Sequence, residues 1–214
     1  MRSRRRLASA SIVSSFSFVW LALACASGPE PSPSELVLDP DEVSWAGPVD
    51  FTYLRTQYGE RADYVAVCEQ GRPLNALYDA AHREDWEEVL ALSGPWLIEC
   101  PVDIDAHFLR WVACDEVGRT IDAAHHSIWF QGLVDSVLAS GRGVADDPYI
   151  VISVAEEYSV LRALRLEHEE QRLVRGGVDA ITARGEDGES VTLYFLAAAH
   201  WRRLQKALED EPGS

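Results

Sequence analysis

Apolar residues recur at helical spacing through the first half of this chain, and the periodicity changes after residue 141. Between residues 85 and 140 they fall at i, i+3 or i+4 and i+7, the spacing of one buried helix face. Three helices are therefore expected, beginning near Asp85, Asp103 and Thr120. Their apolar faces consist of Trp86, Val89, Leu90 and Leu97, then Ile104, His107, Phe108 and Trp111, then His126, Phe130, Leu133 and Val137.

From residue 149 onward, short runs rich in β-branched residues alternate with turn residues, which is the pattern of strands. Strands are expected at residues 149–153, 171–174, 178–183 and 191–197, and helices at 154–166 and 200–208. Helices followed by an antiparallel meander predict the α+β class. We expect N-terminal antiparallel helical hairpins packed with a small C-terminal antiparallel β-meander plus helices.

The helical half contains a weak internal repeat. Residues 84–89 align with residues 118–123 at an offset of 34 residues, which is the period of tetratricopeptide repeats. Residues 103–118 are similar to the first helix of such a repeat, although Trp111 stands where a glycine is usual. Four antiparallel helices without repeat symmetry are an equal alternative.

The N-terminus has the features of an export signal. Four arginines within residues 2–6 precede an uncharged apolar stretch at residues 12–24, which is too short to span a membrane and has the length of a signal-peptide core. Small residues before Cys25 resemble the lipobox of bacterial lipoproteins, so we expect a signal peptide at 1–24 and a lipid on Cys25. Ordinary cleavage after Ala26 is the alternative, which would leave a periplasmic protein.

Residues 25–49 are rich in proline, serine and acidic residues. Proline at this density prevents regular structure and favours an extended tether, from which Val43 and Trp45 are candidates to dock on the folded part. A single α+β domain is expected over 50–210, helical over 50–141 and mixed over 147–210. If Cys25 carries lipid, the absence of aspartate at residue 26 favours the outer membrane over the inner one.

The chain carries 19 basic and 35 acidic residues, a formal net charge of −16. This charge argues against a nucleic-acid partner, because such proteins need a basic face for the phosphates. Removal of residues 1–24 would take away four arginines and no acid. The remaining body would be repelled by anionic lipid headgroups, so the lipid, and not the protein surface, is expected to provide the membrane attachment.

The segment Ser153-Val154-Ala155-Glu156 stands at an expected strand-to-helix junction and has the S-x-x-E pattern of a capping box. We expect the Ser153 side chain to accept the amide of Glu156, and the Glu156 carboxylate to accept the amide of Ser153. Glu157 is favoured by the helix dipole at the same end. Either glutamate is also a candidate general acid or metal ligand.

His107 and His126 lie on the apolar faces of neighbouring expected helices. Antiparallel packing would bring their imidazoles together, with Asp103, Asp122 or Glu157 as a third ligand or orienting carboxylate. Buried, hydrogen-bonded structural histidines are the simpler interpretation. No H-E-x-x-H or C-x-x-C metal motif occurs, and neither a metal nor a cofactor is expected.

Three cysteines remain besides Cys25. A pair formed by Cys100 and Cys114 is geometrically poor, because a helix over 103–117 would separate them by much more than a disulfide spans. Cys68 can pair with either partner, and buried free thiols are an equal alternative.

The order of these features resembles the bacterial family known as domain of unknown function 4919. The resemblance rests on residues 50–58, 103–107, His126, residues 133–141, residues 149–158, 171–173 and 193–195. The run that ends in Glu156-Glu157-Tyr158 is its most specific part, whereas Gly141-Arg142-Gly143 replaces a Gly-Asp-Gly that is frequent in the family. The resemblance implies an exported, often lipid-anchored protein and implies no activity.

These observations predict an extracytoplasmic protein of the bacterial envelope that acts as a non-catalytic interaction module. Its partners would be the membrane, through the N-terminal lipid, and an unknown envelope protein or peptide. An extracytoplasmic metal-binding protein or hydrolase that uses His107, His126 and Glu157 is the alternative. A purely structural envelope protein is the third possibility.

Overall fold

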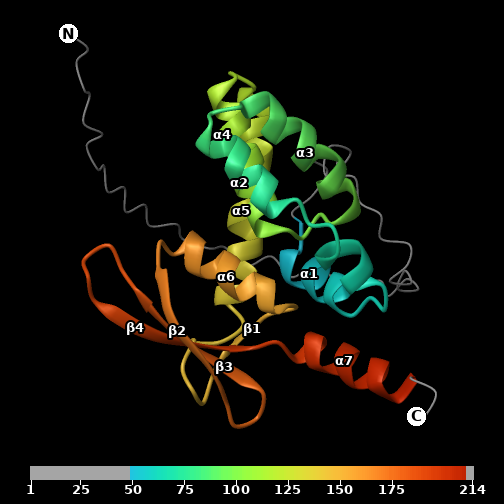
Figure 1. The fold of residues 1–214 in the computed structure, drawn as a ribbon, viewed down its shortest axis with the longest axis vertical. Helices are drawn as coiled ribbons and strands as arrows, with labels where there is room; N and C mark the ends of the chain where they lie inside the picture. The colour runs from blue at the N-terminus through green and yellow to red at the C-terminus, as the bar shows by residue number, and fades with distance from the viewer. Residues whose placement is uncertain (1–48, 211–214) are drawn as a thin grey trace, which may run out of the picture. The chain divides into compact units, whose positions relative to one another are not determined.

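A computed structural model describes residues 49–210, with side chains to residue 206. The expected signal peptide, Cys25 and the tether residues before Val49 lie outside the described residues. The elements are α1 (Phe51–Gly59), the π-helical turn η2 (Val65–Glu69), α2 (Leu74–His82), α3 (Trp86–Glu99), α4 (Ile104–Glu116), α5 (Thr120–Leu138), β1 (Tyr149–Ile150), α6 (Val154–Ala163), β2 (Glu167–Val174), β3 (Val178–Arg184), β4 (Ser190–Leu196) and α7 (Ala198–Asp210) (Figure 1). This order confirms the α+β class.

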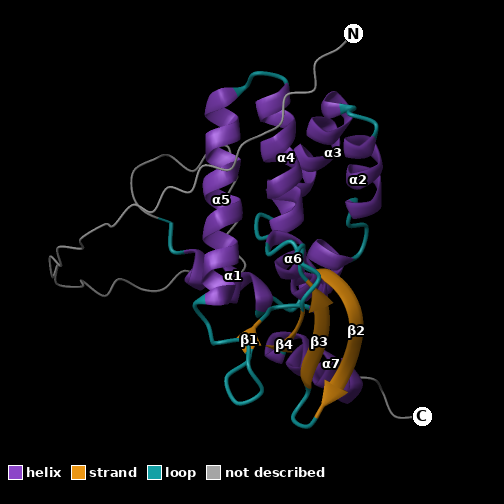
Figure 2. Ribbon diagram, turned by 90° about the vertical axis from the view of Figure 1, so that its left-hand side faces the viewer, coloured by secondary structure: helices purple, strands orange, loops and turns teal. Residues whose placement is uncertain are grey.

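The helical half consists of consecutive helices that pack side by side, with α4 between α3 and α5 (Figure 2). Side chains cap two of these helices where the sequence predicted their starts. The Asp85 carboxylate accepts the amide of Glu88 at 3.1 Å, and the Asp103 carboxylate accepts the amide of Ala106 at 3.1 Å. Each bond satisfies one of the amides that the first turn of a helix leaves without a partner.

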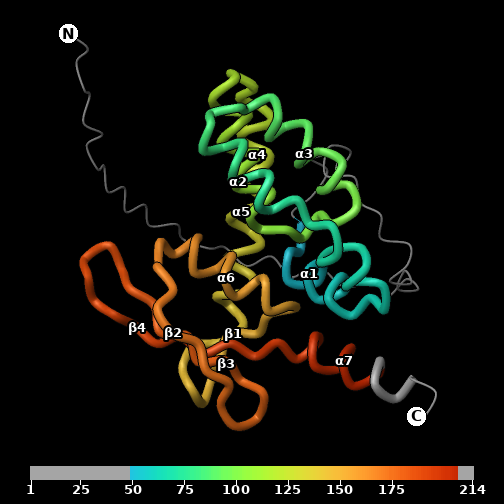
Figure 3. The backbone as a smooth tube through the Cα atoms, in the orientation of Figure 1, coloured from blue at the N-terminus to red at the C-terminus, as the bar shows by residue number. Residues whose placement is uncertain are grey.

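The sheet has the strand order β1-β4-β3-β2. Strands β2, β3 and β4 form the expected antiparallel meander, which can be followed along the chain in Figure 3. The expected strand 149–153 is shorter than predicted: only Tyr149 and Ile150 form β1, which pairs in parallel with β4. The chain leaves the sheet after Val151 because the amide of Ile152 donates to the Glu156 carboxylate at 2.8 Å instead of to a strand.

Helix α6 lies between the helical half and the sheet (Figures 1 and 2). Helix α7 follows β4 and is joined by side-chain bonds to parts of the chain that are distant in sequence. The Trp201 indole donates to the carbonyl of Gly177 at 3.0 Å, and Arg203 donates to the carbonyl of Ile152 at 2.8 Å. Within residues 49–210 the structure contains no helix with the length and apolar character needed to cross a bilayer.

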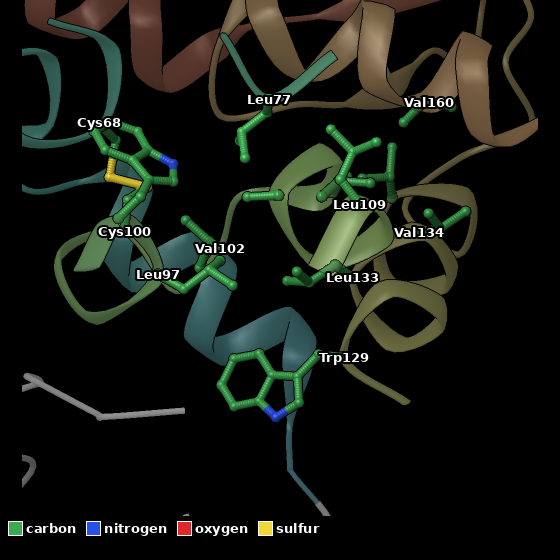
Figure 4. Close-up of a cluster of buried hydrophobic side chains, with 14 of the residues drawn as sticks. Cys68, Leu77, Leu97, Cys100, Val102, Leu109, Trp129, Leu133, Val134 and Val160 are labelled. Atoms are coloured by element: carbon green, nitrogen blue, oxygen red, sulfur yellow. A yellow bond between two sulfur atoms is a disulfide. The ribbon is translucent and has the colours of Figure 1, made fainter. Parts of the chain in front are cut away.

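The helical part of the core includes Leu97, Leu109, Trp129 and Leu133 (Figure 4). Val137 of α5 is buried in the same cluster. These positions confirm most of the predicted apolar faces. Four aromatic residues of the same faces are the exception, because Trp86, Phe108, Trp111 and Phe130 are only partly buried. Phe108, Trp111 and Phe130 line a groove between α4, α5 and α6, and periodicity alone does not show how much of an apolar face the neighbouring elements cover.

Cys68 and Cys100 form a disulfide, with their Cα atoms 5.3 Å apart (Figure 4). Cys114 is a buried free thiol. The bond joins η2 to the residue that follows α3 and closes a sequence separation of 32 residues. One of the two cystine pairings that the sequence left open is therefore present. A cross-link over this distance stabilises the fold, chiefly by restricting the unfolded chain.

Candidate functional site

The side chain of Asp105, in the first turn of α4, is the meeting point of three helices. Its two oxygens accept bonds from Arg162 Nε at 2.9 Å, Arg72 Nη2 at 2.9 Å, Ser159 Oγ at 2.7 Å and the Tyr78 hydroxyl at 3.3 Å, and Arg162 Nη2 adds a further bond. Asp105 is 2% exposed. A carboxylate at this depth is stable only when hydrogen-bond donors surround its oxygens. Here α2, α6 and the loop before α2 supply these donors.

Asp103 extends this network toward α3. It receives Arg72 Nε and Nη2, both at 2.6 Å, and the indole nitrogen of Trp96 at 2.8 Å. Burial acts to raise the pKa of the Asp103 carboxyl, but the Arg72 bonds and charge hold it below its ordinary value. Asp103 therefore acts as an ionised acceptor, and Arg72 bridges it to Asp105.

A groove of about 300 Å³ opens beside this network, between α4, α5 and α6. Its aromatic wall consists of Phe108, Trp111 and Phe130, and its polar end consists of Asp105, Ser159 and Arg162. Tyr78, Ala163 and Arg165 complete the lining. We call this the aromatic groove. Its volume is at the lower end of the range of small-ligand sites.

The aromatic wall is one continuous cluster. The ring centroids of Phe108 and Phe130 are 5.3 Å apart, those of Trp111 and Phe130 are 6.0 Å apart, and those of Phe108 and Trp111 are 6.1 Å apart. Neighbouring, partly exposed aromatic rings on rigid helices are typical of surfaces that bind a partner. The groove thus has the character of a binding site.

The predicted meeting of His107 and His126 occurs, with their Nδ1 atoms 3.0 Å apart. The remaining contacts determine which nitrogens carry protons. Arg110 Nε can only donate, and it lies 2.9 Å from His126 Nε2, so that nitrogen accepts. His126 Nδ1 then donates to His107 Nδ1, and His107 Nε2 donates to the carbonyl of Pro101 at 2.9 Å. Two neutral imidazoles form a chain of bonds from a guanidinium to a backbone carbonyl.

The surroundings of the pair keep both rings uncharged. Burial lowers the pKa of His107 to about 3, and burial together with the charges of neighbouring groups lowers the pKa of His126 to about 2. The His107 ring also stacks on Trp129, with centroids 5.0 Å apart and planes 15° apart. Since all four ring nitrogens have partners, a metal ion could bind here only by displacing one of these bonds.

Glu157 does not join the histidines. It faces the sheet, where Gln171 Nε2 donates to its carboxylate at 3.3 Å and Asp179 of β3 is its charged neighbour. Burial, followed by the charge and hydrogen bonding of Asp179, raises the pKa of Glu157 to about 9. Within residues 49–210, no three or more His, Cys, Asp and Glu side chains are grouped so that they could hold a metal ion.

The structure places Ser153 at the N-cap of α6, where its hydroxyl accepts the amide of Glu156 at 3.2 Å. The reciprocal bond differs from the prediction. The Glu156 carboxylate accepts the amide of Ile152 at 2.8 Å, one residue before the expected amide, and also Arg55 Nη1 at 2.9 Å. Burial raises the pKa of the Glu156 carboxyl, and the Arg55 charge opposes this effect.

Sequence reasoning missed the arginines that complete these sites, namely Arg55, Arg72, Arg110 and Arg162. Each pairs with a group far away in the sequence, for example Arg55 with Glu156 across 101 residues. The spacing of neighbouring residues therefore does not predict these pairs. One usable signal existed: Asp103 and Asp105 fall where an apolar face begins, and buried acids require basic partners.

A family model described as "Domain of unknown function (DUF4919)" matches residues 50–203. These limits nearly coincide with the described fold, from the N-cap of α1 into α7. The search of curated proteins and the search of solved structures both found no match.

The raised pKa of Glu157 predicts a stability that falls as pH rises. From about pH 4.5 to about pH 9 the unfolded chain ionises this carboxyl while the folded protein keeps it protonated, so folding is progressively disfavoured across this range. We expect Glu157→Gln to be more stable than the wild type by about 1–3 kcal/mol near pH 8, with little difference near pH 4. Urea denaturation at both pH values measures this, with Glu170→Gln on the exposed edge strand as the control. A Glu157→Gln variant that is no more stable than the wild type near pH 8 would contradict it.

The histidine pair predicts the opposite dependence at lower pH. Because both pKa values in the folded state lie below the ordinary 6.5, their contribution is complete above about pH 6.5 and is lost as pH falls toward about 3. We expect the double variant His107→Ala/His126→Ala to lose about 3–5 kcal/mol at neutral pH through the cavity and the lost bonds, and to show a flatter acid limb. Urea denaturation of this variant and of the control His168→Ala, at neutral and at acid pH, measures both the loss of stability and the change in the acid limb. Elemental analysis of the same samples measures their metal content. Wild-type stability in the double variant would show that the bonded chain is unimportant.

Proposed function

We propose that this chain, a member of the DUF4919 family, is an exported, lipid-anchored protein of the bacterial envelope that binds a protein or peptide segment in its aromatic groove. The role is non-catalytic. The observation that carries the binding proposal is the groove itself, a cluster of three partly exposed aromatic rings beside an ion-pair network.

Three features support export. The basic residues before the apolar stretch at 12–24 have the order of a signal peptide. Cys25 follows small residues at the end of that stretch, as a lipid-accepting cysteine does. The Cys68–Cys100 disulfide suits an oxidising compartment, since such bonds are rare in the cytosol. Residue 26 is alanine, which favours delivery to the outer membrane.

The mechanism of binding follows from the rigidity of the groove walls. Helices α4 and α6 are joined through Asp105 by three bonds, one from Ser159 and two from Arg162, so the aromatic rings need little reordering when a partner arrives. A preformed apolar surface keeps the entropic cost of binding low. The histidine pair offers no comparable surface, because both rings are buried and bonded on every nitrogen.

If a partner binds in the aromatic groove, removal of one aromatic side chain from the groove wall should weaken its binding. A photo-crosslinking phenylalanine analogue at Phe130 is expected to capture a protein or peptide in intact envelopes, and Trp111→Ala in the same chain is expected to reduce the yield at least about fivefold. The same analogue at Tyr53, an exposed aromatic residue of α1, serves as the control. Identical products from both positions, or a yield unaffected by Trp111→Ala, would refute binding in the groove.

Membrane attachment is predicted to depend on Cys25. Metabolic labelling with a clickable fatty acid should label the wild type and leave Cys25→Ser unlabelled, and the variant should leave the membrane fraction, because the acidic body has little affinity for anionic headgroups. Cys114→Ala, which removes the buried thiol, is the matched cysteine control. Equal labelling of the wild type and Cys25→Ser would exclude lipidation at this residue.

A further inference from the structure

Arg165, at the rim of the aromatic groove, occupies a backbone position that favours glycine. Its φ is 57°, in the left-handed region where a side chain costs free energy that glycine avoids. The position ends α6 in a Schellman motif: the Arg165 amide donates to the carbonyl of Arg162 at 3.0 Å, and the Leu166 amide donates to the carbonyl of Leu161 at 2.9 Å. Folding alone would therefore be served better by glycine here, and strained residues of this kind concentrate at functional sites.

Among the described residues, the ion-pair partner of the Arg165 guanidinium is Glu186, and the pair is weak. The ion pair with Glu186 spans 3.6 Å, and the two side chains are 77% and 72% exposed, so water and salt screen it strongly. This pair can be exchanged for a better one at little cost. Arg165 thus lines the groove with a cation that a ligand can engage.

Arg162 provides a second set of donors at the same end. Its bonds to Asp105 and Ser159 use Nε and Nη2, and no bond from Nη1 to a described residue occurs. The side chain is 38% exposed. The described residues that line the groove include two arginines and one carboxylate, so the lining carries a net positive charge. The protein as a whole is strongly negative.

These features specify an anion with an apolar body. We infer that the aromatic groove binds the C-terminal residue of a peptide, with its carboxylate on Arg162 and Arg165 and its bulky apolar side chain against Phe108, Trp111 and Phe130. This inference rests on the proposed binding function and names its ligand. A volume of about 300 Å³ holds one large side chain and a carboxylate, and is too small for a folded helix.

The carboxylate belongs to a peptide and not to a free amino acid. A free amino acid brings an ammonium group that needs its own acceptor. Asp105 is the acidic residue of the lining, and its oxygens already accept Arg72, Arg162, Ser159 and Tyr78. In a peptide an amide replaces the ammonium group, so this demand disappears.

Titration calorimetry with residues 27–214, which include every described residue, tests the inference. The probes are the acetylated tripeptides Ala-Ala-Phe and Ala-Ala-Leu with free C-termini, the same peptides as C-terminal amides, and free phenylalanine. The free-acid peptides should bind, and the amides and free phenylalanine should bind at least about tenfold more weakly. Equal binding of acid and amide would overturn the carboxylate site, and equal binding of free phenylalanine would overturn the peptide assignment.

Arg165→Gly separates binding from folding, because glycine suits the left-handed position. We expect this variant to bind the free-acid peptides about tenfold more weakly while its melting temperature stays the same or rises. Glu84→Gly is the matched control: Glu84 has φ 56°, is exposed, and lies outside the groove lining. Glycine should relieve the same backbone strain at this position, and peptide binding should be unchanged.

Glu186→Gln removes the ion-pair partner of Arg165 and should strengthen binding of the free-acid peptides about twofold.

The outcomes distinguish this inference from the proposed function. If envelope crosslinking depends on Trp111 but acid and amide peptides bind alike, the groove binds a partner by another feature and only the C-terminal assignment fails. Wild-type affinity in Arg165→Gly would also overturn the assignment. If no free-acid peptide binds at millimolar concentration, the inference is refuted, and the loss of Trp111-dependent crosslinking as well would refute the proposed function.

Discussion

The Asp105 carboxylate is the interaction on which the arrangement of this protein depends. It is buried in the first turn of α4 and takes donors from α2, from α6 and from Arg72, which also binds Asp103. A carboxylate in this position depends on its two arginines, Arg72 and Arg162, because without them its charge would be buried without compensation. The helical half and α6 are consequently held in one relative position, and the aromatic groove forms where they meet.

The buried polar groups divide into two kinds with different consequences. His107, His126 and Arg110 form a chain in which the neutral rings are matched to their neighbours, so the chain adds specificity to a core that apolar packing alone would leave less defined. Glu157 and Asp179 bring two carboxyls together between α6 and the sheet, and one proton must be retained there. The protein is therefore most stable in a window that is bounded by histidine protonation below and by carboxyl ionisation above.

Binding and folding make different demands on the end of α6. The Schellman motif needs a left-handed residue, and the groove needs a cation at the same place. An arginine with positive φ meets both demands at some cost in stability. Together with the half-exposed aromatic wall, it is a departure from what folding alone would favour, and such departures are expected where a protein contacts its partner.

The sequence by itself determined the helices that begin near Asp85, Asp103 and Thr120, the antiparallel meander, the α+β class, the cap at Ser153 and the meeting of His107 with His126, because each depends on short-range periodicity or on neighbouring helices. Only the tertiary structure decided which buried charges pair, since the arginine partners of Glu156 and Asp105 lie 101 and 57 residues away. It also decided the Cys68–Cys100 pairing, the early end of β1, and the exposure of Phe108, Trp111 and Phe130. A periodic pattern shows which face of a helix is apolar, but only the packed neighbours determine how much of that face they cover.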